Sequence, residues 1–307
     1  IHANQFDYEF RLCYLQVIIM KQLNLFIQIT RLNRPIGYLL LFWPCLWGLT
    51  LAYSPDKPIE IYFFYCLLFF LGSVFMRSAG CIVNDVTDKN FDKKVKRTKN
   101  RPIASGKLSI KISFLYVILL CSMALLVLIN FNNLTIFLAF ASMPLAFTYP
   151  LMKRYTYWPQ LFLGITFNYG IILGWASINE AIGLQVIIFY FAAIFWTLGY
   201  DTIYGYQDIN DDEIIGVKST SIKFKKNPKK FLVLCYSFFF ILLTLTGYTM
   251  KFELIFYFSL IFTFAHLFFY QIKNLNIKDP ANCLKIFKSN NFIGLIVFLN
   301  VIIGKLI

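Results

Sequence analysis

Three aspartates follow a long apolar segment of the chain, in the stretch NDVTDKNFD. They are Asp85, Asp88 and Asp92, and we refer to them as the first acidic cluster. If the apolar segment continues as one helix, positions i, i+3 and i+7 lie on one face, and Asn84 lies beside Asp88 on the same side. The pattern therefore predicts three carboxylates and an amide that project in one direction.

A second group of acidic residues ends another apolar segment, in the stretch DINDD. Asp208 and Asp212 form the second acidic cluster, and helical spacing aligns both of them with Asp201. Both clusters fall at helix ends that we expect on the same side of a membrane. They can therefore face each other across one cavity.

Neighbouring carboxylates repel one another, so each acidic cluster needs a cationic partner. The sequence has only 2 histidines, and its 7 cysteines show no metal-binding spacing. A site made of oxygen donors suits Mg²⁺, which is usually held by a few carboxylates together with water and substrate phosphates. The lysines and arginines beside the first cluster supply contacts for a polyanion. Together these features predict a magnesium-bridged diphosphate site at a membrane surface.

The elements that must position these residues are membrane-spanning helices. Hydrophobic residues make up 59% of the chain and aromatic residues 19%, which is more than a soluble core requires. A helix needs about 18 or more apolar residues to cross the bilayer. Nine segments meet this requirement, which predicts an all-α integral membrane protein. They cover approximately residues 35–53, 60–83, 111–130, 134–151, 159–178, 183–205, 231–250, 252–272 and 290–306.

The net charge of +14 could indicate nucleic-acid binding, but the basic residues concentrate in alternate connections between the predicted helices. By the positive-inside rule these connections are cytoplasmic, which places the N-terminus in the cytoplasm. The expected partner is therefore the lipid bilayer and not nucleic acid, and no feature indicates an obligate protein partner. We expect residues 20–307 to form one membrane domain and residues 1–19 to be a non-native or disordered leader.

Arg77 lies inside the predicted second membrane helix, two turns before Asn84. A charged side chain within the membrane is costly, and its presence indicates a functional role. A structural pair with a carboxylate or a backbone carbonyl would also account for it.

NDVTDKNFD and DINDD resemble the two aspartate motifs of the UbiA family of intramembrane prenyltransferases. The stretches RLNRPIGYLLLFWPCLWGL, KRTKNRPIASGKLS, YPLMKRYTYWPQ and YDTIYGYQDINDDEIIGVKST are similar to the branch of that family that acts on 4-hydroxybenzoate. The resemblance covers the chain from about residue 30 onward. It implies a bundle of nine helices around a central cavity, which the cytoplasmic connections 84–109 and 201–230 would cap.

The resemblance also implies an activity, with polyprenyl diphosphate and 4-hydroxybenzoate as substrates. A polyprenyl group would be transferred from its diphosphate to the ring carbon next to the hydroxyl, an early step of ubiquinone synthesis. Mg²⁺ would bridge the diphosphate and stabilise the charge on the leaving group. Its expected ligands are Asn84, Asp85, Asp88, Asp92, Asp208 and Asp212.

The basic residues are assigned by their positions in these motifs. Candidate substrate contacts are Arg77, Lys93, Lys94, Arg97, Arg101 and Lys218, with Arg101 preferred as the phosphate ligand. Lys153 and Arg154 are expected to bind the carboxylate of the aromatic acid, because arginine can bind a carboxylate through two hydrogen bonds.

Asp201 could bond the phenol or receive the ring proton, or it could hold Lys153 or Arg154 in place. An allylic cation needs a dry cavity and aromatic faces that stabilise it by cation–π attraction. Tyr149, Tyr200 and Tyr204 are the rings expected there.

Two alternatives stay open at this point. A related prenyltransferase could act on another aromatic acceptor, such as a naphthoate, a homogentisate or a haem. A secondary transporter could use intramembrane charges as an ion path, but the acidic residues cluster at one membrane face.

The abundance of Phe, Ile, Asn, Lys and Tyr favours a bacterial inner membrane over a mitochondrial one.

Overall fold

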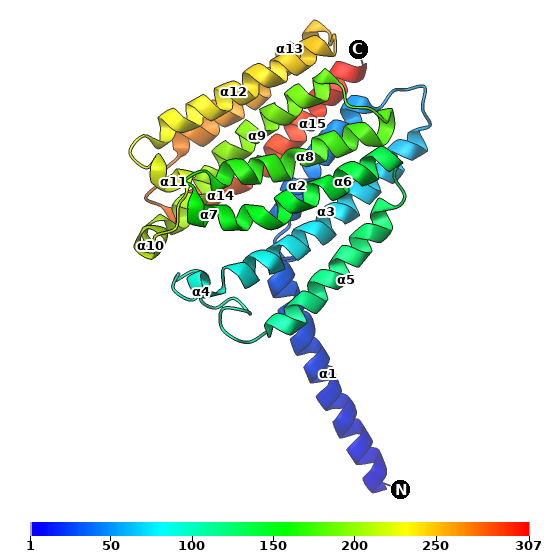
Figure 1. The fold of residues 1–307 in the computed structure, drawn as a ribbon, viewed down its shortest axis with the longest axis vertical. Coiled ribbons are helices and arrows are strands. Elements are labelled where there is room, and N and C mark those ends of the chain that lie inside the picture. Colours follow the sequence, from blue (N-terminus) through cyan, green and yellow to red (C-terminus); the bar gives the residue numbers. More distant parts are fainter. Residues whose placement is uncertain (1, 307) are drawn as a thin grey trace.

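The computed structural model describes residues 2–306, which form helices without any strand. The elements are α1 (His2–Thr30), α2 (Ile36–Ala52), α3 (Ile59–Thr87), α4 (Lys89–Asp92), α5 (Ile110–Leu128), α6 (Asn133–Thr148), η1 (Tyr149–Leu151), α7 (Met152–Tyr155), α8 (Pro159–Asn179), α9 (Leu184–Gly205), η2 (Tyr206–Asp208), α10 (Ile209–Ile215), α11 (Thr220–Lys223), α12 (Pro228–Thr249), α13 (Leu254–Phe264), η3 (Ala265–Ile272), α14 (Pro280–Lys288) and α15 (Asn290–Leu306). The long helices run side by side as one bundle (Figure 1).

The predicted membrane helices correspond to helices of the structure. Over residues 2–306, 8 helical segments are long and apolar enough to cross a bilayer, and α2 is an apolar helix of 17 residues. The α2 helix coincides with the first predicted span, and the 8 longer segments cover the remaining predicted spans. The prediction of an all-α membrane bundle is confirmed, with nine helices as an approximate count.

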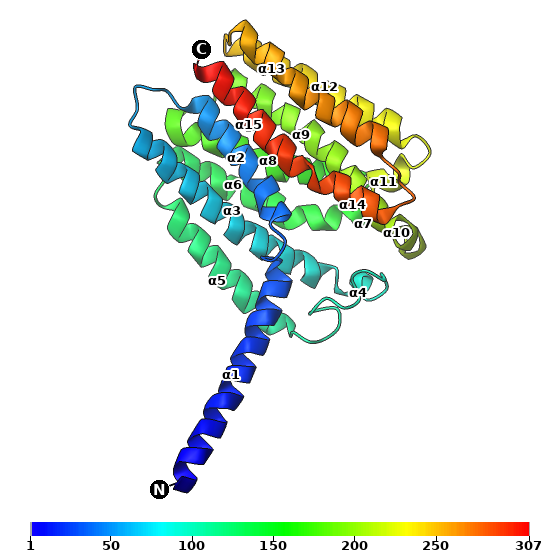
Figure 2. The same ribbon diagram turned by 180° about the vertical axis from the view of Figure 1, so that it is seen from behind.

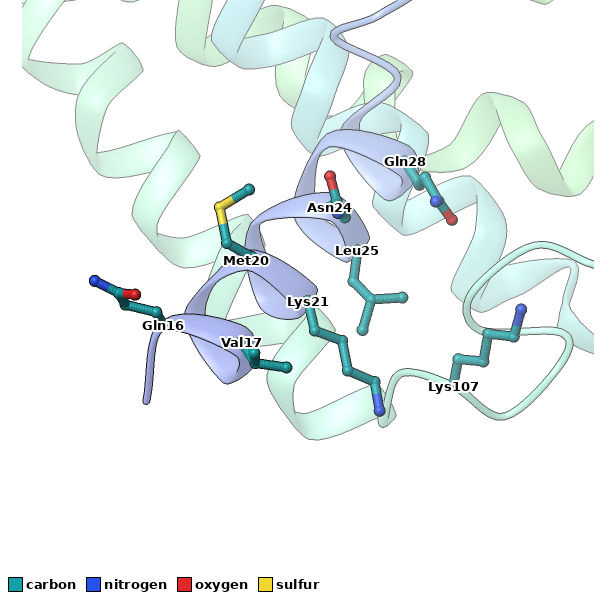
Figure 3. Close-up of a pocket in the computed structure, with 8 residues that line it drawn as sticks. All are labelled: Gln16, Val17, Met20, Lys21, Asn24, Leu25, Gln28 and Lys107. Atoms are coloured by element: carbon teal, nitrogen blue, oxygen red, sulfur yellow. The ribbon is translucent and has the colours of Figure 1, made fainter. Parts of the chain in front are cut away.

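The first helix, α1, extends away from the bundle (Figures 1 and 2). Its last turns pack on the rest of the protein, where Leu25 and Ile29 are buried. A hollow of about 590 Å³ lies between this helix and Lys107 (Figure 3). The helix includes residues 2–19, which we predicted to be a leader, and residue 1 lies outside the described residues. The leader assignment stays a prediction.

The centre of the bundle depends on a close contact between α2 and α8. A Cβ atom at Gly174 would lie 2.2 Å from the Cys45 carbonyl oxygen, and one at Gly48 would lie 2.0 Å from that of Ile171. Small residues allow membrane helices to approach in this way and to gain dispersion energy. The adjacent Trp47 is fully buried and donates its indole N–H to the Gly294 carbonyl at 2.9 Å.

The two acidic segments meet because of the helix directions. The C-terminal ends of α3 and α9 lie at the same end of the bundle, beside the short helices α4, α7 and α10 (Figure 1). The cytoplasmic connections predicted from the sequence therefore gather over one face of the membrane domain.

We expect Gly174→Ala to destabilise the protein, because the added methyl group meets fixed backbone atoms of α2. Overpacking of this kind lowers the free energy of unfolding by about 3 kcal/mol. The measurement is the thermal midpoint of the detergent-solubilised protein. Gly80→Ala is the matched control, because nothing lies within 4 Å of the added Cβ. Equal midpoints for the two variants would contradict the close contact.

Candidate active site

The first acidic cluster lies at the C-terminal end of α3. The alignment of the three aspartates assumed that one helix continues to Asp92, and the structure does not meet this condition: α3 ends at Thr87, Asp88 adopts φ −95° and ψ 5°, and α4 begins at Lys89. Asp and Asn side chains compete for backbone hydrogen bonds and so favour helix ends. All three carboxylates of the cluster are nevertheless buried.

The second acidic cluster follows α9. The helix ends at Gly205, one 3₁₀ turn (η2) ends at Asp208, and α10 carries Asp212. Asp201 lies one turn before the end of α9 and is half-buried.

Both clusters line one cavity of about 1080 Å³ at this end of the bundle. It is also lined by residues from the α1–α2 connection, α7, α8 and α14. Of the predicted site residues, those that line it are Arg77, Asn84, Asp85, Asp88, Asp92, Arg97, Arg101, Tyr149, Lys153, Tyr200, Asp201, Tyr204, Asp208, Asp212 and Lys218. The expectation that the two clusters face one cavity agrees with this arrangement.

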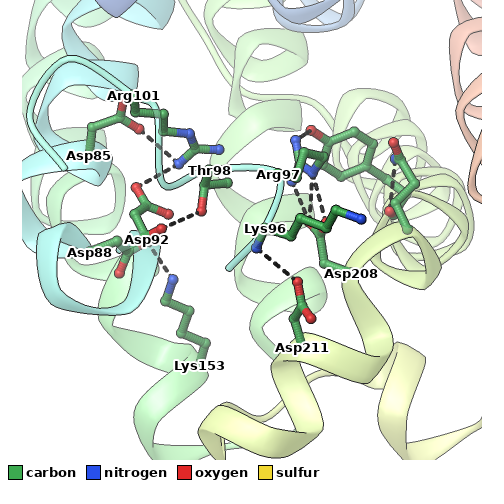
Figure 4. Close-up of polar contacts among 12 residues, drawn as sticks. Asp85, Asp88, Asp92, Lys96, Arg97, Thr98, Arg101, Lys153, Asp208 and Asp211 are labelled. Atoms are coloured by element: carbon green, nitrogen blue, oxygen red, sulfur yellow. Dashed lines mark hydrogen bonds and ion pairs between the residues drawn. The ribbon is translucent and has the colours of Figure 1, made fainter. Parts of the chain in front are cut away.

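Basic side chains neutralise the first cluster (Figure 4). Arg101 donates from Nη1 to Asp92 Oδ2 at 2.8 Å and to Asp85 Oδ1 at 3.1 Å. Arg31 reaches the same oxygen of Asp85 at 2.5 Å. The ammonium group of Lys153, on α7, pairs with Asp88 Oδ2. Four segments of the chain are thus joined through these carboxylates.

Arg97 joins the connection after α4 to the end of α9 (Figure 4). Its Nε donates to the two carboxylate oxygens of Asp208 at 2.8 and 3.0 Å, and its Nη2 also bonds Asp208. Its guanidinium carbon lies 5.6 Å from the centre of the Tyr204 ring. The backbone N–H of Lys96 donates to Asp211 at 3.1 Å. We call the contact between the Arg97 guanidinium and the Asp208 carboxylate the Arg97–Asp208 clasp.

The first cluster keeps acceptor capacity that the protein does not use. Asp88 Oδ1 is buried without a hydrogen-bond partner, and burial raises the pKa of this carboxyl although Lys153 opposes the effect. Over the described part of the chain, no three His, Cys, Asp or Glu side chains converge closely enough to hold a metal ion by themselves. The oxygen donors therefore fit Mg²⁺ best if phosphate and water complete its coordination.

Arg77 lies deeper in the same cavity. Its Nε is buried and has no hydrogen-bond partner, and its guanidinium carbon lies 5.3 Å from the centre of the Phe167 ring. A Cβ at Gly37 would lie 2.9 Å from this Nε, so the glycine leaves space for the guanidinium group. Within residues 2–306 Arg77 forms no ion pair, so the alternative of a structural carboxylate partner is not what the structure shows.

Three predicted site residues lie elsewhere. Lys93 and Lys94 are exposed and do not line the cavity. Arg154 is also outside the lining, where it donates to the Thr87 carbonyl oxygen at 2.8 Å and lies over the Phe91 ring. Lys218 lines the cavity but directs its Nζ to the Tyr155 carbonyl at 3.2 Å.

Sequence reasoning missed several lining residues. Arg31 and Arg34 line the cavity and are not among the predicted site residues, although both belong to the stretch RLNRPIGYLLLFWPCLWGL. Gln160 ends the stretch YPLMKRYTYWPQ, whereas Phe287 and Asn291 carry no pattern that would have distinguished them from core residues.

The sequence model of the UbiA prenyltransferase family matches residues 41–300. The chain is 43% identical over 287 residues to the mitochondrial 4-hydroxybenzoate polyprenyltransferase of Bos taurus, covering 93% of this chain and 76% of the relative. The human relative of the same name is 42% identical over the same shares of the two chains. That of Arabidopsis thaliana is 38% identical over 95% of this chain and 71% of the relative.

Solved structures share the fold. A UbiA homolog from Aeropyrum pernix superposes with a TM-score of 0.72 at 22% identity, covering 87% of this chain and 98% of that one. A UbiA homolog from Archaeoglobus fulgidus, bound to GPP and Mg²⁺, gives a TM-score of 0.66 at 16% identity over 92% and 100% of the two chains. The family match and the relatives at about 40% identity show that the chain belongs to the UbiA prenyltransferase family.

Proposed function

We propose that the protein transfers a polyprenyl group from polyprenyl diphosphate to 4-hydroxybenzoate, at the ring carbon ortho to the hydroxyl, in ubiquinone biosynthesis. The observation that carries this proposal is the cavity, in which two acidic clusters and several basic residues meet at one end of a membrane bundle. The names of the relatives supply the acceptor. In the reaction the allylic C–O bond breaks, a C–C bond forms to the ring, diphosphate leaves and the ring carbon loses a proton.

The two acidic clusters would hold Mg²⁺ together with the diphosphate. When bound, Mg²⁺ neutralises the negative charge that develops on the leaving diphosphate. Asp88 supports this role most directly, because one of its buried oxygens has no partner in the protein. The ligands we propose are Asn84, Asp85, Asp88, Asp92, Asp208 and Asp212.

The cationic side chains that pair with the carboxylates would also bind the diphosphate. Arg101, Lys153 and Arg97 each line the cavity and each bond a carboxylate of an acidic cluster. A diphosphate offers these side chains additional acceptors of the same charge, and arginine binds phosphate through two parallel hydrogen bonds. We propose Arg101 as the main phosphate contact, because it already joins Asp85 to Asp92.

The acceptor carboxylate is better matched by Arg77 than by the residues first predicted. Lys153 is paired with Asp88 and Arg154 lies outside the cavity, whereas Arg77 presents an unpartnered guanidinium nitrogen inside it. A charged donor without a partner gains most from an anionic ligand. Asp201, which lines the same cavity, would bond the phenol or receive the proton from the ring carbon.

Aromatic side chains form the wall beside these groups. Tyr149, Tyr200 and Tyr204 line the cavity, and the Phe287 ring lies 4.5 Å from that of Tyr204. Ring faces attract an allylic cation and exclude the water that would destroy it.

The protein is a multi-pass membrane protein, and we propose that it lies in an inner membrane where ubiquinone is made. The relatives described above are mitochondrial proteins. Their names weigh against the bacterial inner membrane that the residue composition favoured, and they support the mitochondrial one. Fractionation of cells that express the tagged protein would distinguish these two membranes.

We expect membranes that contain the protein to form prenylated 4-hydroxybenzoate only when Mg²⁺ is present. Asp88→Asn and Asp212→Asn should each lower the rate roughly a hundredfold, the cost of losing one group that stabilises the leaving-group charge. The measurement is incorporation of labelled 4-hydroxybenzoate with a polyprenyl diphosphate.

Asp56→Asn is the matched control, because Asp56 lies in the α2–α3 connection at the other end of the bundle. Labelled naphthoate and homogentisate test other acceptors in parallel. Product formation that survives chelation of Mg²⁺, or equal loss in the control, would contradict the proposed site.

Arg77→Gln should raise the KM for 4-hydroxybenzoate by about tenfold or more, since a hydrogen bond to a charged group contributes about 1.5–3 kcal/mol. The KM for polyprenyl diphosphate should stay unchanged. Arg154→Gln is the control for charge removal near the site. If Arg154→Gln raises the KM for 4-hydroxybenzoate and Arg77→Gln does not, the first prediction for the carboxylate was right and the present assignment is wrong.

Arg97→Ala should increase the proportion of polyprenyl diphosphate that is hydrolysed to the alcohol instead of being transferred. The Arg97–Asp208 clasp ties one cytoplasmic connection over the cavity, and its loss admits water to the reacting carbon. The measurement is the ratio of polyprenyl alcohol to prenylated acid. Lys94→Ala, which removes an exposed charge from the same connection, should leave this ratio unchanged; an equal rise in both variants would refute the role of the clasp.

A further inference from the structure

A network of buried polar side chains lies in the bundle behind the cavity. Asn290, at the start of α15, accepts hydrogen bonds at Oδ1 from Trp196 Nε1 at 2.9 Å and from Gln271 Nε2 at 3.1 Å. Tyr236 donates its hydroxyl to Gln271 Oε1 at 2.6 Å. All four side chains are 0% exposed. We call them the Asn290 network, and they connect α9, α12, η3 and α15.

Polar side chains can join membrane helices through hydrogen bonds of this kind, and here they join four elements. Amide side chains in an apolar interior cost free energy unless every polar atom is paired, and apolar residues of the same size would pack without this requirement. Gln271 also lies in η3, an eight-residue π-helix from Ala265 to Ile272. π-Helical turns occur frequently at functional sites.

One connection from the network reaches the cavity through α14. The Asn290 amide donates from Nδ2 to the carbonyl oxygens of Phe287 at 3.1 Å and Ile286 at 3.3 Å. These bonds fix the C-terminal end of α14, where the Phe287 ring lies 4.5 Å from Tyr204 and 5.8 Å from Tyr200. A second connection runs through Trp196, whose ring lies 4.8 Å from that of Tyr200 in an edge-on arrangement.

Tyr200, Tyr204 and Phe287 all line the cavity, and we call them the aromatic wall. Two separate connections from Asn290 therefore end on the same wall. Tyr200 has a further distinguishing feature, because its hydroxyl is buried without a hydrogen-bond partner and its ring is held by packing alone. The position of this wall thus depends on the residues behind it.

We infer that Asn290 is a positioning residue, which sets the aromatic wall at the place where the allylic cation develops. This inference rests on the proposed function. Cation–π attraction requires the cation within about 6 Å of a ring centre, and displacements of about 1 Å can cost as much as a hundredfold in rate. Asn290 itself does not touch the substrate and acts through Phe287 and Trp196.

The chain provides a matched control on the same helix. Asn300 also lies on α15 and is 2% exposed, and its Nδ2 donates to Thr263 Oγ1 at 2.9 Å. It does not line the cavity, and its partner belongs to α13. Asn290→Leu removes four buried hydrogen bonds and Asn300→Leu removes one, and only the first variant should move the aromatic wall.

The experiment compares both variants with the wild type in membranes, with rates normalised to the folded fraction. Asn290→Leu should lower kcat for prenyl transfer about tenfold and leave the KM for 4-hydroxybenzoate unchanged. Asn300→Leu should keep the wild-type kcat although it also lowers the thermal midpoint, because it removes a buried hydrogen bond. Equal kcat in the two variants would overturn the inference, because the network would then contribute only to stability.

Phe287→Leu gives a second variant that leaves the network in place and does not depend on the folding of Asn290→Leu. It should lower kcat by a similar factor, and in its presence the additional effect of Asn290→Leu should become smaller, because only the connection through Trp196 remains and coupled residues are not additive. Wild-type kcat in Phe287→Leu, or additive losses in the double variant, would overturn the inference. Absence of transfer by the wild type would instead overturn the proposed function, so the two failures are distinguishable.

Discussion

The arrangement of the site depends on the need to neutralise aspartates that are buried at the ends of membrane helices. Asp85, Asp88 and Asp92 are almost inaccessible, and an unpaired carboxylate in such surroundings is strongly unfavourable. Each carboxylate therefore forms an ion pair with a cation from another segment of the chain. These ion pairs hold the connections against the bundle, and they collect the positive charge that a diphosphate requires.

The helical bundle supplies what these ion pairs cannot, a fixed and apolar surrounding. Close contact between α2 and α8 at Gly48 and Gly174 sets the centre of the bundle, and the ends of α3 and α9 then fall beside the same cavity. A lipid diphosphate has a charged head and an apolar chain, so a site at the membrane surface with its walls in the membrane suits both parts.

Much of the fold and of the site follows from local patterns in the sequence. Apolar segments of sufficient length give the membrane helices, and the spacing of Asp85, Asp88, Asp208 and Asp212 predicts that they act together. Tertiary contacts decide the rest. Whether Lys153 or Arg154 enters the cavity depends on the turn of a short helix, since Arg154 bonds the end of α3.

The Asn290 network behind the cavity also depends on tertiary contacts, so it could not be predicted from the sequence. Asn290 and Gln271 are single amides in apolar segments, and only the packing of four elements brings them together. The same holds for Arg31, which is separated from Asp85 by 54 residues. Pairings over such separations leave no periodic signal in one sequence.

We propose that the two acidic clusters act together on one magnesium-bound diphosphate. The Kd of the purified protein for farnesyl diphosphate, determined across a series of Mg²⁺ concentrations, tests this proposal. Binding should be tight, should require Mg²⁺ and should weaken when either cluster loses an aspartate. Binding of equal strength without the metal, or binding that only one of the two clusters affects, would contradict it.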